Sequence, residues 1–189
     1  MKNLINLWII GLVILTSCST VEFEEPLPKD TKPLKSFPKH LLGKYIDSEN
    51  KDTLIISKQG FDYGGKNNFF SLNGELLVNN TVLKKFGDYY VLSKKGKNDN
   101  SWGIIPFKAV DNKIQVYYLL LDIDTKDKVK AAEYKEEKLA RLQAITEVKT
   151  ITDSKNNVEN YLINPTNEQL KKMLKEDMFI KIIEFRRID

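Results

Sequence analysis

Residues 81–94, TVLKKFGDYYVLSK, hold two short strand-like runs on either side of Gly87-Asp88. The runs Thr81–Phe86 and Tyr89–Lys94 are rich in β-branched, aromatic and other apolar side chains, which favour a pleated strand. Gly87-Asp88 fits the tight turn that joins two antiparallel strands. The stretch therefore predicts a β-hairpin.

Similar runs separated by turn residues lie before and after this hairpin. Asn73-Gly74 between two of them is the strongest short hairpin signal in the chain. The further expected strands are Gly43–Ile46, Thr53–Ser57, Phe69–Leu72, Glu75–Val78, Trp102–Val110 and Lys113–Leu121. Consecutive strands joined by short turns predict an antiparallel meander. A meander of this length must form a curved sheet or a barrel to cover its apolar face and its edges.

The pattern changes after residue 121. Residues 126–144 contain no glycine or proline and many good helix formers, so they predict a helix. A strand pair, Thr146–Thr152 and Val158–Ile163, is expected next. Thr166 and Gln169 have the spacing of a capping box at the start of a second helix near 166–177. The apolar run Phe179–Phe185 predicts a C-terminal strand. The fold class is mainly β (α+β), in a single domain over residues 39–189.

The N-terminus has the three-part layout of a secretory signal peptide over residues 1–17, ahead of Cys18, the only cysteine. Leu15-Thr16-Ser17-Cys18 resembles the bacterial lipobox. The resemblance implies cleavage after Ser17 and diacylation of Cys18, so that the acylated cysteine anchors the protein in a membrane. The apolar run is too short for a spanning helix, which needs about 20 apolar residues.

Residues 18–38 are expected to form the lipidated N-terminus and a flexible tether, because they hold four of the six prolines and many charges. The acidic cluster Val21–Glu25 is similar to export signals of some Bacteroidetes lipoproteins. The whole organisation is similar to small uncharacterised lipoproteins of that phylum. This resemblance implies an outer membrane lipoprotein of the cell envelope, and it leaves open whether the domain faces the periplasm or the cell exterior.

Leu41-Leu42-Gly43-Lys44-Tyr45, at the start of the meander, is similar to the Gly-x-Trp start of lipocalin-like (calycin) barrels. Tyr45 takes the place of the tryptophan. The resemblance implies that this aromatic ring packs under the base of a barrel, and that the barrel carries a small apolar ligand.

The sequence contains little recognisable catalytic chemistry. His40, the only histidine, lies at the border between tether and domain and is interpreted as an exposed loop residue rather than a member of a nucleophilic triad. One histidine cannot supply a zinc site, and no phosphate-binding glycine loop is present. Asp122, Asp124, Thr125 and Asp127 resemble the start of a calcium loop. They lack its glycine and its distal glutamate, so a turn and a helix cap explain them better. No metal, cofactor or catalytic residue is assigned.

These observations favour a non-catalytic binding module over an enzyme. Its partners are the membrane, through acylated Cys18, and an envelope protein, a glycan or a small ligand. Nucleic acid is not expected, because 30 basic and 26 acidic side chains are interspersed along the chain. Two alternatives stay open: a carrier of an apolar ligand, and a carboxylate-dependent envelope hydrolase. Tyr89-Tyr90 and Tyr117-Tyr118 each place one ring on either face of a strand, where one ring could contact a ligand.

Overall fold

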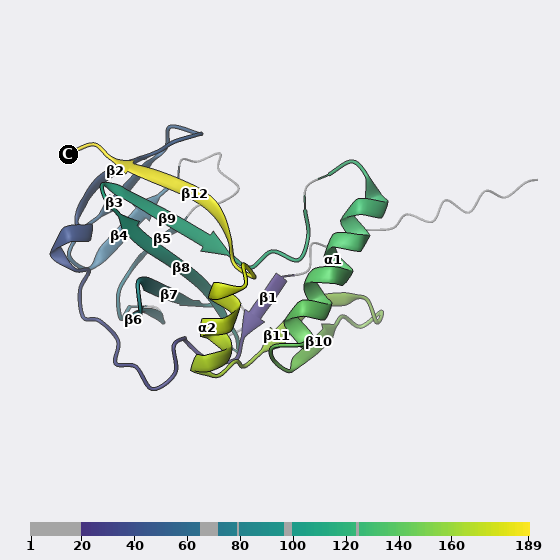
Figure 1. Ribbon diagram of the computed structural model, residues 1–189. Coiled ribbons are helices and arrows are strands. Elements are labelled where there is room, and N and C mark those ends of the chain that lie inside the picture. The colour runs from purple at the N-terminus through teal and green to yellow at the C-terminus, as the bar shows by residue number, and fades with distance from the viewer. Residues whose placement is uncertain (1–19, 65–71, 79, 97–99, 124) are drawn as a thin grey trace, which may run out of the picture.

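The computed structural model describes the whole chain except residues 1–19, 65–71, 79, 97–99 and 124. The described residues form a mixed sheet of twelve strands, the last of them C-terminal, together with two α-helices (Figure 1). The predicted fold class, mainly β with two helices, is confirmed.

Strands β2 to β9 follow one another along the chain, and after β9 the two α-helices are interspersed with the last three strands. The strands are β1 (Thr20–Phe23), β2 (Gly43–Asp47), β3 (Thr53–Ile56), β4 (Gly60–Tyr63), β5 (Leu72–Glu75), β6 (Thr81–Phe86), β7 (Tyr89–Lys95), β8 (Trp102–Val110), β9 (Lys113–Tyr118), β10 (Val148–Thr152), β11 (Val158–Ile163) and β12 (Ile180–Arg187). The helices are the 3-10 helix η1 (Lys39–Leu41) and the α-helices α1 (Lys128–Gln143) and α2 (Asn167–Lys175).

Nine of these strands curl around an apolar interior. The C-terminal strand β12 joins two arms of the sheet, one running through β2, β3, β4 and β5, the other through β9, β8, β7 and β6. Among the described residues, β5 pairs only with β4 and β6 pairs only with β7. The sheet is therefore curved but not closed into a barrel. It is also not purely antiparallel, because β1 runs parallel to β11.

The hairpin of residues 81–94 forms as predicted. Phe86 pairs with Tyr89 across the two-residue turn, and Gly87 has a φ of 56°, which a glycine adopts without strain. α2 begins with the predicted capping box: Thr166 Oγ1 accepts from the Gln169 backbone, and Gln169 Oε1 accepts from the Thr166 backbone.

The prediction of a turn at Asn73-Gly74 is wrong. Both residues lie within β5, paired with Asp62 and Phe61 of β4, a strand that was not predicted. The glycine serves packing instead, because a Cβ on Gly74 would lie 3.1 Å from the Phe61 ring. The chain reverses after β5 through Leu77 and Asn80, which have φ of 65° and 57°. The expected strand residues 69–71 lie outside the described residues.

The prediction of a flexible tether is wrong for residues 20–38. β1 is part of the sheet between β11 and β8, and Leu27 and Phe37 are buried. The Lys84 ammonium, itself buried, donates to the Pro26 and Pro28 carbonyls at 2.9 and 2.7 Å. Proline lacks a backbone N–H, but its carbonyl still accepts, so this proline-rich segment is held by side-chain donors. The folded domain therefore includes residues from Thr20 onward.

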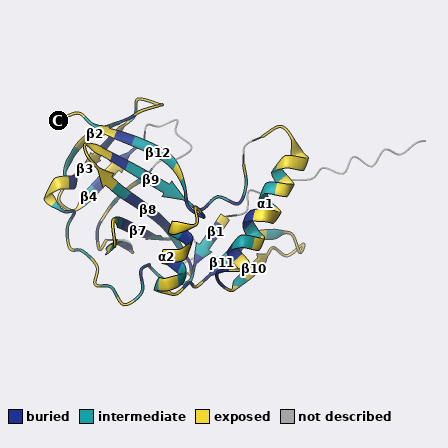
Figure 2. Cartoon of the chain, in the orientation of Figure 1, coloured by how far each residue is buried: buried dark blue, intermediate teal, exposed yellow. Residues whose placement is uncertain are grey.

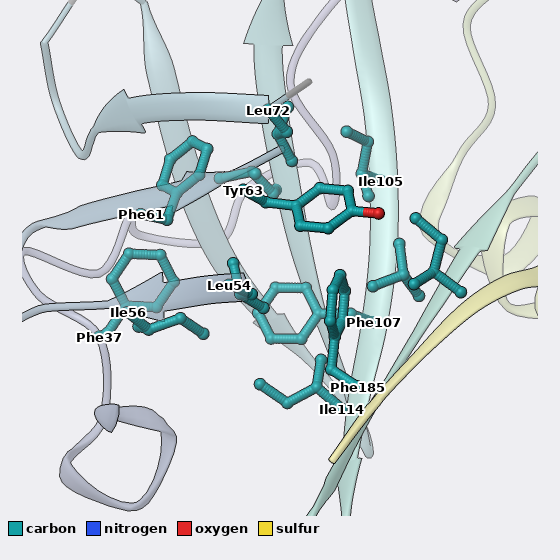
Figure 3. Close-up of a pocket in the computed structure, with 13 residues that line it drawn as sticks. Phe37, Leu54, Ile56, Phe61, Tyr63, Leu72, Ile105, Phe107, Ile114 and Phe185 are labelled. Atoms are coloured by element: carbon teal, nitrogen blue, oxygen red, sulfur yellow. The ribbon is translucent and has the colours of Figure 1, made fainter. Parts of the chain in front are cut away.

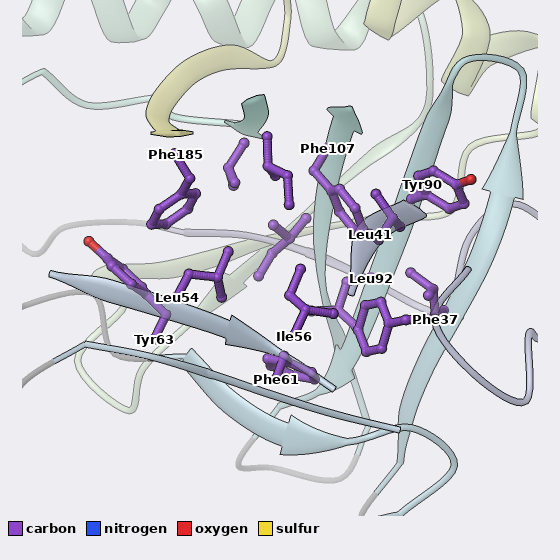
Figure 4. Packing of buried hydrophobic residues seen from close by; sticks show 14 of the residues in the cluster. Phe37, Leu41, Leu54, Ile56, Phe61, Tyr63, Tyr90, Leu92, Phe107 and Phe185 are labelled. Carbon is purple, nitrogen blue, oxygen red and sulfur yellow. The ribbon is translucent and has the colours of Figure 1, made fainter. Parts of the chain in front are cut away.

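The buried apolar residues form two cores, one on each face of β8. Figure 2 shows buried residues on the strands and on α1 and α2. The first core fills the concave interior (Figure 4) and includes Phe37, Leu41, Tyr45, Leu54, Ile56, Phe61, Tyr63, Leu92, Ile105, Phe107, Ile114, Val116 and Phe185. The second core lies between the outer face of β7 and β8, the strand β1 and the helices. It includes Phe23, Leu27, Val91, Ile104, Leu142, Tyr161, Leu170, Met173 and Met178.

Candidate functional site

A small cavity lies inside the first core (Figure 3). Its volume is about 50 Å³, and it is lined by Phe37, Leu54, Ile56, Phe61, Tyr63, Leu72, Leu92, Ile105, Phe107, Ile114, Val116, Ile183 and Phe185. Apolar and aromatic side chains from both arms of the sheet form its wall. An apolar cavity of about 150 Å³ admits benzene. This cavity alone is therefore too small for anything longer than a few carbon atoms.

A buried pair of polar groups, Asp47 and Tyr63, lies beside this cavity. The Tyr63 hydroxyl donates to Asp47 Oδ2 at 2.8 Å, and the Glu49 and Asn50 backbone amides donate to Asp47 Oδ1 at 2.8 and 3.3 Å. Burial raises the pKa of Asp47, but these hydrogen bonds outweigh it and leave the pKa below its usual value. Burial and the Asp47 charge raise the pKa of Tyr63. Asp47 therefore stays an ionised carboxylate that anchors Tyr63 in the cavity wall.

A larger hollow, of about 310 Å³, opens beside the cavity. It is lined by Thr20, Val21 and Glu22 of β1, Leu72 of β5, Lys94, Lys95 and Gly96 at the end of β7, Gly103 and Ile105 of β8, and Tyr118 of β9. Apolar and charged residues thus meet in this hollow.

The hollow exists because two neighbours of β8 diverge. β8 pairs with β1 only at Trp102, and its pairing with β9 begins at Phe107. The intervening residues include Gly103, which has no side chain to fill the gap. A Cβ at Gly103 would meet only the Lys94 carbonyl, at 3.7 Å, so there is free space around this position.

The cavity and the hollow adjoin, since Leu72 and Ile105 line both. Figure 3 shows these two side chains together at one side of the cavity. The combined space is apolar in the cavity, and the charged residues that line the hollow are Lys94, Lys95 and Glu22; this charged part is called its mouth. Such a space matches an amphipathic molecule, with its tail toward the cavity and its polar head at the mouth.

The paired tyrosines occupy opposite faces of their strands, as predicted. Tyr90 is buried in the first core, and Tyr118 packs against that core and lines the hollow. Tyr89 and Tyr117 are half-buried, Tyr117 packs against the second core, and the two rings meet edge to face at 5.7 Å. The Lys108 ammonium lies 4.7 Å from the Tyr89 ring, and the hydrogen bond to Tyr89 raises the pKa of Lys108.

The remaining predicted residues fall into structural roles or outside the described residues. Asp127 caps α1 by accepting from the backbone amides of Val129 and Lys130, while Asp122 pairs with Lys135 at 3.4 Å. His40 Nε2 lies 3.2 Å from the Tyr90 hydroxyl. Asp124 and Cys18 lie outside the described residues, so lipidation of Cys18 stays a prediction.

No group of three or more His, Cys, Asp or Glu side chains in the described part of the chain is arranged to hold a metal ion. None of the helices that this part forms combines the length and the apolar character needed to cross a membrane.

The lipocalin-like start implied that Tyr45 packs under the base of a barrel, but the described strands form a sheet that is not closed, and Tyr45 packs in the first core instead. Its hydroxyl donates to the Leu41 carbonyl at 3.0 Å, and the Arg187 guanidinium lies 5.7 Å from its ring centre. Comparisons with protein-family models, with curated proteins and with solved structures found no match to this chain. The assignment of function therefore rests on the site itself.

Sequence reasoning did not identify the residues that make the hollow. Leu72, Gly103 and Ile105 were expected only as parts of strands. One signal was available: Gly103 is an isolated glycine in the otherwise apolar run Trp102–Val110, and such a glycine often marks a place where something other than its own side chain fills the space.

Proposed function

We propose that this protein is a lipid-anchored cell-envelope protein, held by acylated Cys18, that acts as a non-catalytic binding module for a small amphipathic ligand. The observation that carries the ligand proposal is the sharing of Leu72 and Ile105 between an apolar cavity and a hollow with a charged mouth. The tail of the ligand contacts Ile105 and the cavity wall, and its head lies at the mouth.

The charges at the mouth favour an anionic head group. Among the described residues that line the hollow, two are basic, Lys94 and Lys95, and one is acidic, Glu22. The Lys94 ammonium donates to the Asn73 carbonyl at 3.0 Å, which holds it at the rim. A carboxylate or phosphate there gains charge-assisted hydrogen bonds. Fatty-acid-like molecules combine this head with an unbranched apolar tail.

Calorimetric titration of the mature chain carrying Cys18→Ser with decanoate and with decylamine tests the ligand class. These two probes share a tail and differ in head charge. Saturable binding of decanoate, at least about tenfold tighter than decylamine (1.4 kcal/mol), is the expected result. Absence of saturable binding for both molecules would refute the ligand proposal, and preference for decylamine would refute the anionic head.

The anchor has its own test. Cells grown with labelled palmitate should incorporate label into the wild-type protein and lose it with Cys18→Ala. Label that persists in the Cys18→Ala variant would refute the anchor at Cys18 and leave the ligand site untouched.

A further inference from the structure

The first described residues of the chain form the rim of the hollow. Thr20, Val21 and Glu22 of β1 line it. β1 is fixed in place by its parallel pairing with β11, and Thr20 Oγ1 donates to Asn160 Oδ1 at 2.7 Å. The first described residues of the chain and the mouth of the hollow therefore lie at the same place.

The distance from this rim to the anchor is bounded by covalent geometry. One residue, Ser19, separates Cys18 from Thr20. An extended chain spans at most about 3.6 Å per residue, so the Cα of Cys18 lies within about 7 Å of the Cα of Thr20, whatever the conformation between them. The polar headgroup layer of a bilayer is of similar thickness, about 5–8 Å per leaflet.

We infer that the folded domain rests directly on the bilayer, with the mouth of the hollow facing the lipid headgroups, and that the ligand enters from the membrane. This inference rests on the anchor in the proposed function. The short link leaves no room for a spacer between acyl groups and domain. Lys94 and Lys95 at the mouth then face the headgroup layer, where basic side chains are attracted to anionic lipids.

The opposite end of β8 identifies the side that faces away from the membrane. β8 runs from Trp102, next to β1, to Val110, and the turn Asp111-Asn112 follows it. Nine strand residues at about 3.3 Å each separate the two ends by roughly 26 Å. Label positions at the two ends therefore report opposite sides of the domain.

Fluorescence quenching in lipid nanodiscs tests the orientation. The full acylated chain is reconstituted in phosphatidylcholine with phosphatidylglycerol and a headgroup nitroxide lipid. A fluorophore is attached to Lys95→Cys or, as the matched control, Asp111→Cys. Glu159→Cys, next in sequence to Asn160, which pairs with Thr20, replaces the first label if that variant does not fold. Loss of most of the fluorescence at residue 95 or 159, and little at 111, is expected. Equal quenching at both ends, or stronger quenching at 111, would overturn the inference.

A second preparation separates this inference from the anchor proposal. Unacylated chain, with the fluorophore introduced at residue 95 or 111 as a fluorescent non-natural amino acid so that Cys18 is the single thiol, is coupled to a maleimide lipid through Cys18, which imposes the anchor chemically. The same quenching pattern in this preparation supports the geometry even if palmitate labelling shows that cells do not acylate Cys18. Equal quenching at the two ends of β8 refutes the proposed orientation even if cells do acylate Cys18.

Transfer of a fluorescent fatty acid identifies the source of the ligand. Vesicles preloaded with it are mixed with anchored protein or with the soluble Cys18→Ser variant. If the ligand enters from the bilayer, transfer to the anchored protein should be faster than transfer to the soluble variant. Its rate should also not depend on the concentration of free fatty acid in solution. Equal rates for the two proteins would show entry from solvent and overturn this part of the inference.

Discussion

The two cores of this molecule share one sheet but differ in how completely they are filled. In the second core, six apolar side chains, Leu27, Val91, Leu142, Leu170, Met173 and Met178, are 0% exposed. The first core encloses a cavity of about 50 Å³ and adjoins the hollow. Strand β8 serves both cores, since Ile104 belongs to the second and Ile105 to the first.

The filled second core serves packing, whereas the space in and beside the first core is the proposed binding site. A void removes dispersion contacts from its lining and costs stability. The helices close the second core, whereas no element among the described residues pairs with β8 between Trp102 and Phe107 on the side of the hollow. The following predictions test this contrast between the filled second core and the first core with its cavity, beginning with the largest effect.

Truncation in the filled core should have the largest effect on stability. Met173→Ala removes a fully buried side chain from α2, so we expect the free energy of unfolding to fall by about 2–5 kcal/mol. Denaturant titration measures this change. Lys171→Ala, at an exposed position of the same helix, should stay within about 0.5 kcal/mol of wild type. A loss below about 1 kcal/mol for Met173→Ala would contradict the tightly filled second core.

Removal of the Lys84 ammonium should release the proline-rich segment. Lys84→Met leaves the Pro26 and Pro28 carbonyls without their donor, which should cost about 1–3 kcal/mol. Native-state trypsin digestion should then cut faster at Lys29 and Lys35, which lie in that segment. Lys58→Met, at an exposed turn position, is the control. Unchanged cleavage in the Lys84→Met variant would show that the segment is held by other contacts.

One added methylene should have opposite effects in the two cores. Val91→Ile overpacks a fully buried position and should destabilise by about 1–3 kcal/mol. Val116→Ile points an extra methyl toward the cavity and should be neutral or stabilising by up to about 1 kcal/mol. Thermal melts of the two matched variants give the comparison directly. Equal destabilisation would mean that the cavity has no usable space.

Acid should weaken the edge of the first core through Asp47. Its pKa is lowered in the folded state from the usual 3.8, because the hydrogen bonds outweigh burial, so the carboxylate stabilises the fold above that value. This contribution is lost as pH falls through the folded-state pKa. Melting temperatures between pH 5 and 2 should fall less for Asp47→Asn than for wild type. Asp111→Asn, in an exposed turn, should follow wild type.

The sequence was most informative where contacts are local. The hairpin of residues 81–94, the capping box at Thr166 and the caps of both helices depend on neighbours in the chain, and all of them form as predicted. The parallel pairing of β1 with β11 joins Thr20 to Asn160, and composition contains no sign of such a distant partner. Leu27 and Phe37 are core residues, but the prolines and charges around them predicted a tether.

The site was less predictable than the fold. Asn73-Gly74 has the composition of a turn, but its glycine is needed for contact with Phe61. The hollow arises where β1 and β9 diverge from β8, and strand divergence depends on tertiary packing rather than on residue type. Gly103 carried a weak signal as an isolated strand glycine, and Leu72 carried none.

A bulky side chain at residue 103, which fills the hollow, tests directly whether the hollow is a ligand site. Decanoate is titrated into the wild-type chain, Gly103→Leu and Ala109→Leu, each with Cys18→Ser. Gly103→Leu places a side chain in free space of the hollow, whereas Ala109→Leu adds the same bulk at an exposed position of the same strand. We predict that Gly103→Leu weakens binding at least about tenfold, a loss of 1.4 kcal/mol, with an unchanged melting temperature, and that Ala109→Leu binds like wild type. Equal affinity in all three proteins would contradict a ligand site in the hollow.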